Sequence, residues 1–141
     1  MDSDLVLERL RFAGLRPTRQ RQQLAALLWG KGHRHITAEA LHRESSVAGI
    51  KVSLATVYNT LHQFTTHQLL REIVVDQGSS YFDTNMDDHH HFLCMDTGEL
   101  ADIPADMIRV EKMPAAPMGM QVDAVDVIIR VSKAKPSMAS A

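Results

Sequence analysis

Three consecutive histidines, His89, His90 and His91, form the strongest chemical signal in the sequence. In an extended segment alternate side chains share a face, so we expect His89 and His91 to converge while His90 points away. Two imidazoles placed in this way chelate a divalent cation that still needs other ligands. The cluster therefore predicts a metal site, and a polar surface loop is the alternative interpretation.

Residue type indicates where the remaining ligands come from. Asp83 closes a predicted strand, Asp102 lies in a strand expected to pair with the histidine segment, and His35 comes from the first half of the chain. Mixed imidazole and carboxylate ligation suits Fe²⁺, Mn²⁺ or Zn²⁺, and affinity alone does not separate these ions. Cys94 is the single cysteine, so it forms neither an internal disulfide nor a cysteine-rich zinc site, and we predict that it is a buried small hydrophobe.

The first half of the chain predicts four helices, each with its own capping residue. Their expected caps and extents are Ser3 with a helix to about 13, Thr18 with a helix to Gly30, Thr37 with a helix to about 47, and Ser53 with a helix over 54–66. The fourth helix is expected to bury one apolar stripe and to expose a polar face without acids. Such a face leaves room for phosphates and base edges, although an ordinary amphipathic helix is the alternative.

A hairpin is expected after these helices. Residues 70–75 have the β-branched richness of a strand, 77–79 have turn composition, and 80–83 form the returning strand. Helices followed by a hairpin are typical of a winged helix-turn-helix.

The second half predicts a smaller unit of strands. We expect strands at 92–95 and 99–103 around a turn at 96–98, a helix from Pro104 to about Lys112, and a final strand over 121–131. A lobe this small is not easily stable alone, so we expect a homodimer. The fold class is then α+β, with a winged helix-turn-helix domain at 1–83, a small α/β dimerisation domain at 84–131 and a flexible tail at 132–141.

Charge is divided unevenly along the 141 residues. Residues 1–75 contain ten Lys and Arg against six Asp and Glu, whereas 76–141 contain five against eleven, giving +4 and −6. This asymmetry favours a DNA-binding first half, with chance variation as the alternative. No apolar stretch is long enough to span a membrane and the first residues are acidic, so we expect a soluble, cytoplasmic protein. No nucleophile elbow or phosphate-binding glycine loop is present, and we expect no enzymatic activity.

Four segments together resemble the ferric uptake regulator superfamily: residues 14–21 (GLRPTRQR), 35–39 (HITAE), 52–61 (VSLATVYNTL) and 89–94 (HHHFLC). The resemblance implies a homodimeric, metal-sensing transcription factor that binds a double-stranded DNA operator. It implies that one divalent ion is bound by His35, Asp83, His89, His91 and Asp102. We predict DNA contacts from Arg16, Arg19, Ser53, Thr56, Tyr58 and Asn59, with Arg16 at the minor groove and Tyr58 and Asn59 on the recognition helix.

The chain also departs from the usual pattern of that superfamily. Asn59 replaces an arginine, and an amide pairs with adenine where arginine prefers guanine. Thr97 stands where many relatives have a cysteine, so the structural zinc site should be absent, and Arg109 leaves an additional metal site incomplete. These features look most like the iron response regulator branch, in which haem reports iron status. The resemblance then implies that His89, His90 and His91 are the available haem ligands.

The leading hypothesis is a metal- and haem-responsive DNA-binding regulator of iron homeostasis, in which haem competes for the metal-binding imidazoles. An alternative within the same superfamily is an iron-dependent peroxide sensor, because the aspartate and histidine ligands resemble those of the peroxide-responsive branch. Two alternatives from other classes are a metal-dependent hydrolase and a dimeric metal-storage or delivery protein.

Overall fold

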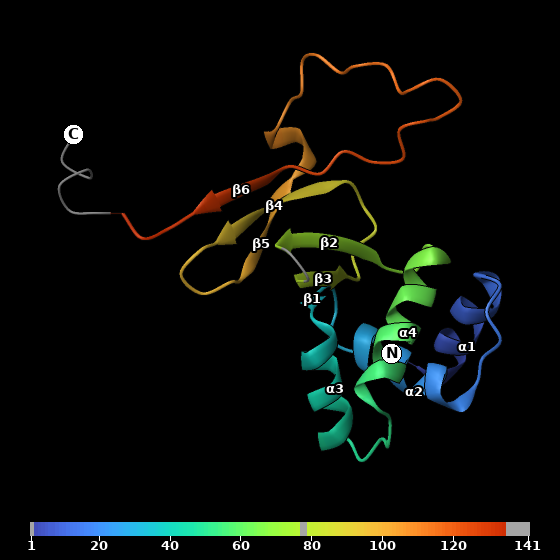
Figure 1. Ribbon diagram of the computed structural model, residues 1–141. Coiled ribbons are helices and arrows are strands. Elements are labelled where there is room, and N and C mark those ends of the chain that lie inside the picture. Colours follow the sequence, from blue (N-terminus) through green and yellow to red (C-terminus); the bar gives the residue numbers. More distant parts are fainter. Residues whose placement is uncertain (1, 77–78, 135–141) are drawn as a thin grey trace. The chain divides into compact units, whose positions relative to one another are not determined.

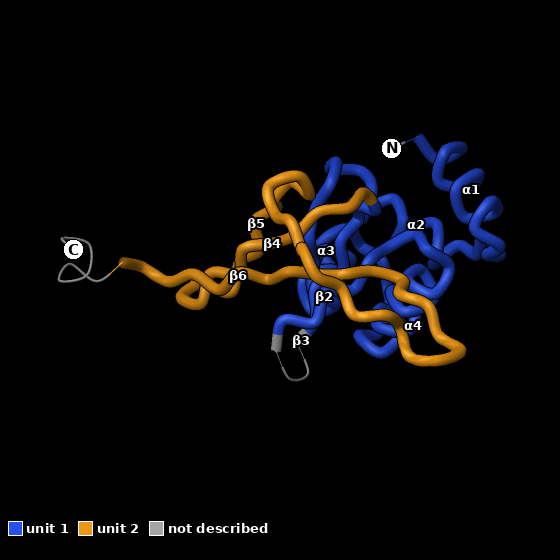
Figure 2. Tube along the Cα trace, turned by 90° about the horizontal axis from the view of Figure 1, so that it is seen from above, with its two compact units in different colours: residues 1–86 blue, residues 87–141 orange. Residues whose placement is uncertain are grey.

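The computed structural model describes residues 2–76 and 79–134 and divides the chain into two compact units. Unit 1 comprises residues 1–86 and unit 2 residues 87–141, coloured blue and orange in Figure 2. The sequence-based boundary lies three residues earlier, after 83. The fold class is α+β, with the helices in unit 1 and strands in both units (Figure 1).

Four helices make up most of unit 1: α1 (Ser3–Phe12), α2 (Arg19–Trp29), α3 (Ala38–Val47) and α4 (Leu54–Thr66). Thr18, Thr37 and Ser53 accept hydrogen bonds from backbone N–H groups in the first turns of α2, α3 and α4, as predicted. The predicted cap of α1 is wrong by one residue. Asp2 accepts from the N–H of Asp4, and Ser3 is already helical.

The core of unit 1 lies between these helices. Leu10 of α1, Leu24 and Leu28 of α2, and Leu61 and Phe64 of α4 have no solvent exposure. Along α4 the apolar residues recur at helical spacing and face this core, which leaves the opposite face of the helix exposed. Packing against the core therefore fixes which side chains of α4 are available to a partner.

A three-stranded antiparallel sheet completes unit 1. It contains β1 (His35–Ile36), β2 (Arg71–Asp76) and β3 (Ser79–Asp83) in the order β1-β3-β2, and His35 lies directly opposite Asp83. Strands β2 and β3 confirm the predicted hairpin strands, whereas the predicted turn falls largely on 77–78, outside the described residues. The sequence did not predict β1, because two residues are too few to show an alternating pattern.

Unit 2 is built on β4 (His89–Cys94), which pairs with β5 (Leu100–Pro104) in the antiparallel sense and with β6 (Ile128–Val131) in the parallel sense. Strand β4 begins at the triple histidine, three residues earlier than predicted. The turn after β4 matches the predicted one, since the N–H of Gly98 donates to the carbonyl of Cys94 at 2.7 Å. Among the described residues, no helix is long and apolar enough to cross a membrane.

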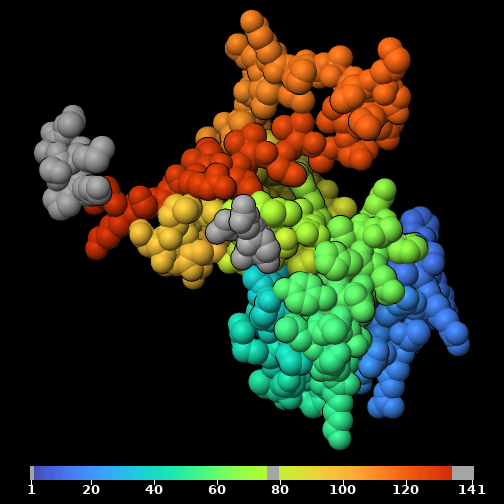
Figure 3. Space-filling view, in the orientation of Figure 1, coloured from blue at the N-terminus to red at the C-terminus, as the bar shows by residue number. Residues whose placement is uncertain are grey.

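The predicted helix from Pro104 to Lys112 is wrong. Pro104 ends β5, and a single 3₁₀ turn, η1 (Ala105–Met107), follows without a side-chain cap. The apolar side chains of this segment, Met107 and Val110, are 72% and 44% exposed, so they find no surface in the described part of the chain against which a helix would pack. In Figures 1 and 3 the orange segment that follows forms an open loop.

The predicted final strand is correct only at its C-terminal end. Residues 121–127 are not in a strand, and β6 covers Ile128–Val131. The register explains this difference, because β6 pairs with β4 from His91 opposite Ile128 to Cys94 opposite Val131. A strand extends only as far as its partner offers backbone groups, and β4 begins at His89, so in this parallel register residues 121–125 have no partner residue on β4.

Candidate metal centre and nucleic-acid interface

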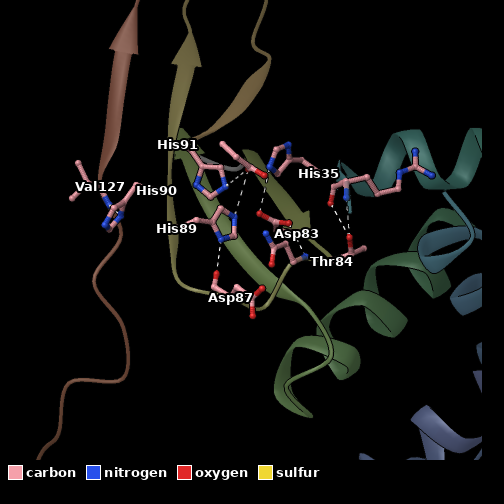
Figure 4. Close-up of polar contacts among 11 residues, drawn as sticks. His35, Asp83, Thr84, Asp87, His89, His90, His91 and Val127 are labelled. Atoms are coloured by element: carbon pink, nitrogen blue, oxygen red, sulfur yellow. Dashed lines mark hydrogen bonds and ion pairs between the residues drawn. The ribbon is translucent and has the colours of Figure 1, made fainter. Parts of the chain in front are cut away.

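The histidines of β4 and an aspartate of β5 form a cluster of metal-ligating atoms within unit 2. His89 and His91 share one face of β4, and His91 lies directly opposite Asp102 on β5. The Nε2 atoms of His89 and His91 lie 3.6 and 3.4 Å from Oδ1 of Asp102 (Figure 4). Both imidazoles are buried whereas Asp102 is exposed. His89 and His91 converge on one face of β4 as predicted, and Asp102, a candidate ligand by residue type, lies against both.

A backbone contact orients the first of these histidines. Nδ1 of His89 hydrogen-bonds to the carbonyl oxygen of Asp87. Since a carbonyl only accepts, Nδ1 donates this hydrogen bond, and Nε2 is the ring nitrogen that faces Asp102. A hydrogen bond on the opposite ring nitrogen is the usual arrangement that fixes a metal-binding histidine.

A second pair of candidate ligands lies within unit 1. Nε2 of His35 is 3.4 Å from Oδ2 of Asp83, across the pairing of β1 with β3. Asp83 is buried, and its other oxygen accepts a hydrogen bond from the N–H of Asn85 at 2.9 Å. A buried carboxylate needs compensating positive charge or hydrogen bonds. The donor set of each unit, imidazole nitrogen with carboxylate oxygen, therefore fits a divalent cation.

Arg34 anchors the strand that carries His35. Its guanidinium forms a two-pronged ion pair with Glu44 of α3, and these hydrogen bonds lower the pKa of Glu44 below its ordinary value. Its backbone N–H donates to Oγ1 of Thr84 at 2.9 Å, and its carbonyl accepts from the N–H of Thr84 at 3.0 Å. Arg34 thus connects the His35 and Asp83 pair to α3, which packs against α4.

His90 points to the opposite face of β4. Its Nδ1 accepts a hydrogen bond from the N–H of Val127 at 3.0 Å (Figure 4). The three predicted haem ligands are therefore divided between two faces of one strand, with His89 and His91 on one and His90 on the other. His90 secures the segment before β6, a role that the sequence did not indicate.

The exposed face of α4 carries the predicted DNA-contacting residues. Ser53 caps the helix and also donates from its hydroxyl to Oγ1 of Thr56 at 2.9 Å. Asn59 is exposed and Tyr58 is half-buried. No acidic residue occurs within α4, as the sequence shows. The face therefore offers hydroxyl and amide groups without a carboxylate of its own.

The other two predicted DNA contacts are exposed: Arg19 is the first residue of α2, and Arg16 lies in the segment just before it. Sequence reasoning missed the side chain that fixes this region. The guanidinium of Arg21 donates to the carbonyl of Arg16 at 2.8 Å and to Oε1 of Gln63 on α4 at 3.0 Å. Arg21 thus connects the Arg16 segment directly to the helix that carries Asn59. No local pattern predicts this contact, because 42 positions separate Arg21 from Gln63.

Cys94 is not the buried hydrophobe that the sequence predicted. It is partly exposed at the end of β4, and a hydrogen bond from the side chain of Thr97 lowers the pKa of its thiol. The prediction failed because Cys94 lies at the strand terminus, where the following turn brings polar groups to its sulfur.

A winged-helix unit joined to a small mixed-sheet unit with an imidazole and carboxylate cluster is the architecture of a metal-dependent regulator. The model of the ferric uptake regulator family matches residues 12–130. The chain belongs to this family. Because members of the family are DNA-binding transcription regulators and not enzymes, the hydrolase alternative has no support.

Individual proteins of known structure or function are also similar to this chain. The structure of the ferric uptake regulator from Pseudomonas aeruginosa with manganese is similar with a TM-score of 0.74 and 30% identity, covering 93% of this chain and 99% of that one. The Vibrio cholerae ferric uptake regulator shares the fold, with a TM-score of 0.70, 24% identity, and coverage of 90% and 98%. The peroxide-responsive repressor PerR of Staphylococcus aureus is 36% identical over 93 residues, 66% of this chain. That match spans 62% of the length of the repressor.

Proposed function

We propose that this protein is a metal-responsive transcriptional regulator that binds a double-stranded DNA operator as a homodimer. The observation that carries the proposal is the presence of metal-ligating groups in both units, His35 and Asp83 in unit 1, and His89, His91 and Asp102 in unit 2. We assign DNA binding to residues 1–83 and metal sensing with dimerisation to residues 84–131. The family membership and the acid-free face of α4 support this assignment.

All five ligands hold one ion in this proposal. Asp83 and His89 are six residues apart, and an extended chain spans at most about 3.6 Å per residue, so their Cα atoms are always within about 22 Å. Such a short connection gives the second set of ligands a high effective concentration once the first has bound. Fe²⁺, Mn²⁺ and Zn²⁺ all suit this donor set.

Simultaneous ligation restricts the segment that joins the two units. When bound, the cation supplies the positive charge that holds carboxylates of both units together. His35 and Asp83 would then tie the ion to the sheet of unit 1, and His89, His91 and Asp102 would tie it to the sheet of unit 2. In a homodimer this constraint sets the spacing of the two α4 helices, and operator half-sites demand a defined spacing. Metal occupancy thereby shifts the population toward DNA-competent geometry.

Operator affinity tests this function. We expect DNA selected from a random duplex pool with Mn²⁺ present to bind about tenfold or more tightly with Mn²⁺ than with a chelator, because allosteric couplings are worth about 1–3 kcal/mol. Fluorescence anisotropy at fixed ionic strength measures both affinities. Equal affinities would exclude metal control. Failure to enrich any sequence would exclude DNA recognition and favour a metal-storage or delivery protein.

A peroxide-responsive regulator is the second candidate function. The similarity to the S. aureus repressor favours it, as does a donor set containing only histidines and aspartates. Iron bound there would make a histidine ligand susceptible to oxidation by peroxide. We expect iron-loaded protein treated with peroxide to gain one oxygen on His35 or His89, detected by peptide mass spectrometry, with Mn²⁺-loaded protein as the control. If the peptides containing His35 and His89 both remain unmodified in peroxide-treated, iron-loaded protein, this candidate is excluded.

Regulation by haem, as in the iron response regulator branch, is a competing proposal for the signal that the protein senses. Its ligands would be His89, His90 and His91, which the two faces of β4 divide into a pair and a single residue. Titration with haem distinguishes it from peroxide sensing. A saturable Soret shift that disappears in His90→Ala or in a His89→Ala, His91→Ala double variant supports haem binding, whereas no shift excludes it.

A further inference from the structure

The hydroxyl of Tyr58 on α4 is already engaged within unit 1. It donates a hydrogen bond to Oε1 of Glu39 on α3 at 2.7 Å. This bond lowers the pKa of Glu39 and raises the pKa of Tyr58. At neutral pH the proton therefore stays on the phenol and Glu39 stays a carboxylate. A carboxylate only accepts hydrogen bonds, so the direction of this bond is fixed.

A phenol has one donor and two acceptor lone pairs. Because the donor of Tyr58 is used by Glu39, the hydroxyl can only accept a hydrogen bond from another molecule. Phosphate oxygens also only accept, so they are excluded as partners of this hydroxyl. In the major groove the available donors are the amino groups of adenine and cytosine.

One further neighbour, His62, restricts the Tyr58 side chain. The ring of His62, one helical turn along α4, stacks on it with centroids 6.3 Å apart and planes at 17°. The carboxylate of Glu39 places a negative charge beside the hydroxyl, which repels phosphates, while Arg43 on α3 offsets part of that charge. The phenol is therefore oriented by α3 as well as by its own helix.

We propose that Glu39 is a specificity-determining residue, which makes the Tyr58 hydroxyl an obligate acceptor and thereby selects a base pair presenting an adenine or cytosine amino group. This inference rests on the proposed function, since it assigns a role within operator recognition. Glu39 acts through Tyr58 and need not touch DNA itself. Asn59, the next residue on the exposed face, reads independently through its amide.

Binding-site selection from random duplex DNA, with Mn²⁺ present, tests this role. For the wild-type protein we expect one base pair at which adenine or cytosine is preferred and at which Tyr58→Phe loses about fivefold discrimination, the equivalent of one hydrogen bond of roughly 1 kcal/mol. In Glu39→Ala the hydroxyl becomes free to donate. The preference at that same base pair should then relax or change toward guanine or thymine, which present acceptors.

Two variants separate the hydrogen bond from the charge. Glu39→Gln keeps an acceptor oxygen for Tyr58 but removes the negative charge, so it should retain the wild-type base preference while binding all DNA more tightly. Glu8→Gln removes an exposed carboxylate on α1 and controls for the change in net charge. Thermal unfolding by circular dichroism confirms that each variant is folded.

The outcomes are distinguishable. Identical base preferences in wild-type protein, Glu39→Ala and Tyr58→Phe would overturn the role of Glu39 while leaving operator binding intact. A changed preference in Glu39→Gln as large as in Glu39→Ala would also overturn it, because the charge rather than the acceptor would then be responsible. Enrichment of no sequence by wild-type protein would instead overturn the proposed function.

Discussion

His91→Ala is expected to lower the affinity for Mn²⁺ by about 100-fold or more and to remove the metal dependence of operator binding. His91 is 1% exposed and lies directly opposite Asp102, so its Nε2 has no alternative position from which to reach the cluster. Loss of residues that only orient a ligand costs about 10–100-fold in metal affinity, and loss of a ligand should cost at least as much. Isothermal titration calorimetry measures the change directly.

The neighbouring residue provides a matched control for His91→Ala. His90→Ala removes the same side chain one position earlier on β4, but from the opposite face, where it contacts Val127. Metal affinity in His90→Ala should remain within about twofold of the wild type, in line with the small effects of substitutions away from a site. An equal loss of affinity in both variants would show that the alternation along β4 does not define the ligands.

The same titrations test whether the two units share one ion. If all five ligands bind one ion, His35→Ala in unit 1 should weaken Mn²⁺ binding, as His91→Ala does. The double variant should then lose little affinity beyond that lost by the more severe single variant. The stoichiometry should be one ion per chain. Two ions per chain, each lost in only one of the variants, would show two separate sites and contradict the shared-ion proposal.

Local chemistry made much of unit 1 predictable. Side chains such as Thr18, Thr37 and Ser53 form their capping bonds within three residues, so the sequence alone shows where the helices begin. Helix α4 follows its predicted extent because one apolar stripe runs along its whole length. Asp2 displaced Ser3 as a cap because both residue types suit that position and only the backbone conformation distinguishes them.

Unit 2 was less predictable because its elements depend on their neighbours. The preference of proline for the first helical position suggested a helix from Pro104 to about Lys112, yet Met107 and Val110 remain exposed in the described structure. The length of β6 is set by β4 rather than by its own alternating residues. Tertiary context overrides local preference in such segments.

The candidate metal ligands were predictable in type and partly in position. Alternation along β4 and its pairing with β5 bring His89, His91 and Asp102 together, and both features can be read from the sequence. The contacts that orient the proposed DNA-binding face of α4 were not predictable. The bond between Tyr58 and Glu39 joins residues 19 positions apart on different helices, and neither residue carries a signal for the other.

Phe64→Ala is expected to destabilise unit 1 by about 3–5 kcal/mol, the usual cost of emptying a buried phenylalanine site. Phe64 is fully buried and stacks on Trp29 with ring centroids 5.9 Å apart and planes at 19°. Since a domain is stable by only about 5–15 kcal/mol, this loss is a large share of the total. Trp29 is the single tryptophan, so its fluorescence during urea unfolding reports on this unit.

Phe12→Ala is the matched control for Phe64→Ala, because Phe12 belongs to the same unit and is 98% exposed. Its removal should change the free energy of unfolding by less than about 0.5 kcal/mol. Equal destabilisation by the two variants would contradict the assignment of the core. Operator affinity should follow the same order, because Phe64 holds α4 from the side opposite Asn59. A Phe64→Ala protein that retained full operator affinity would show that DNA binding by the exposed face of α4 does not depend on the packing of α4 against α2.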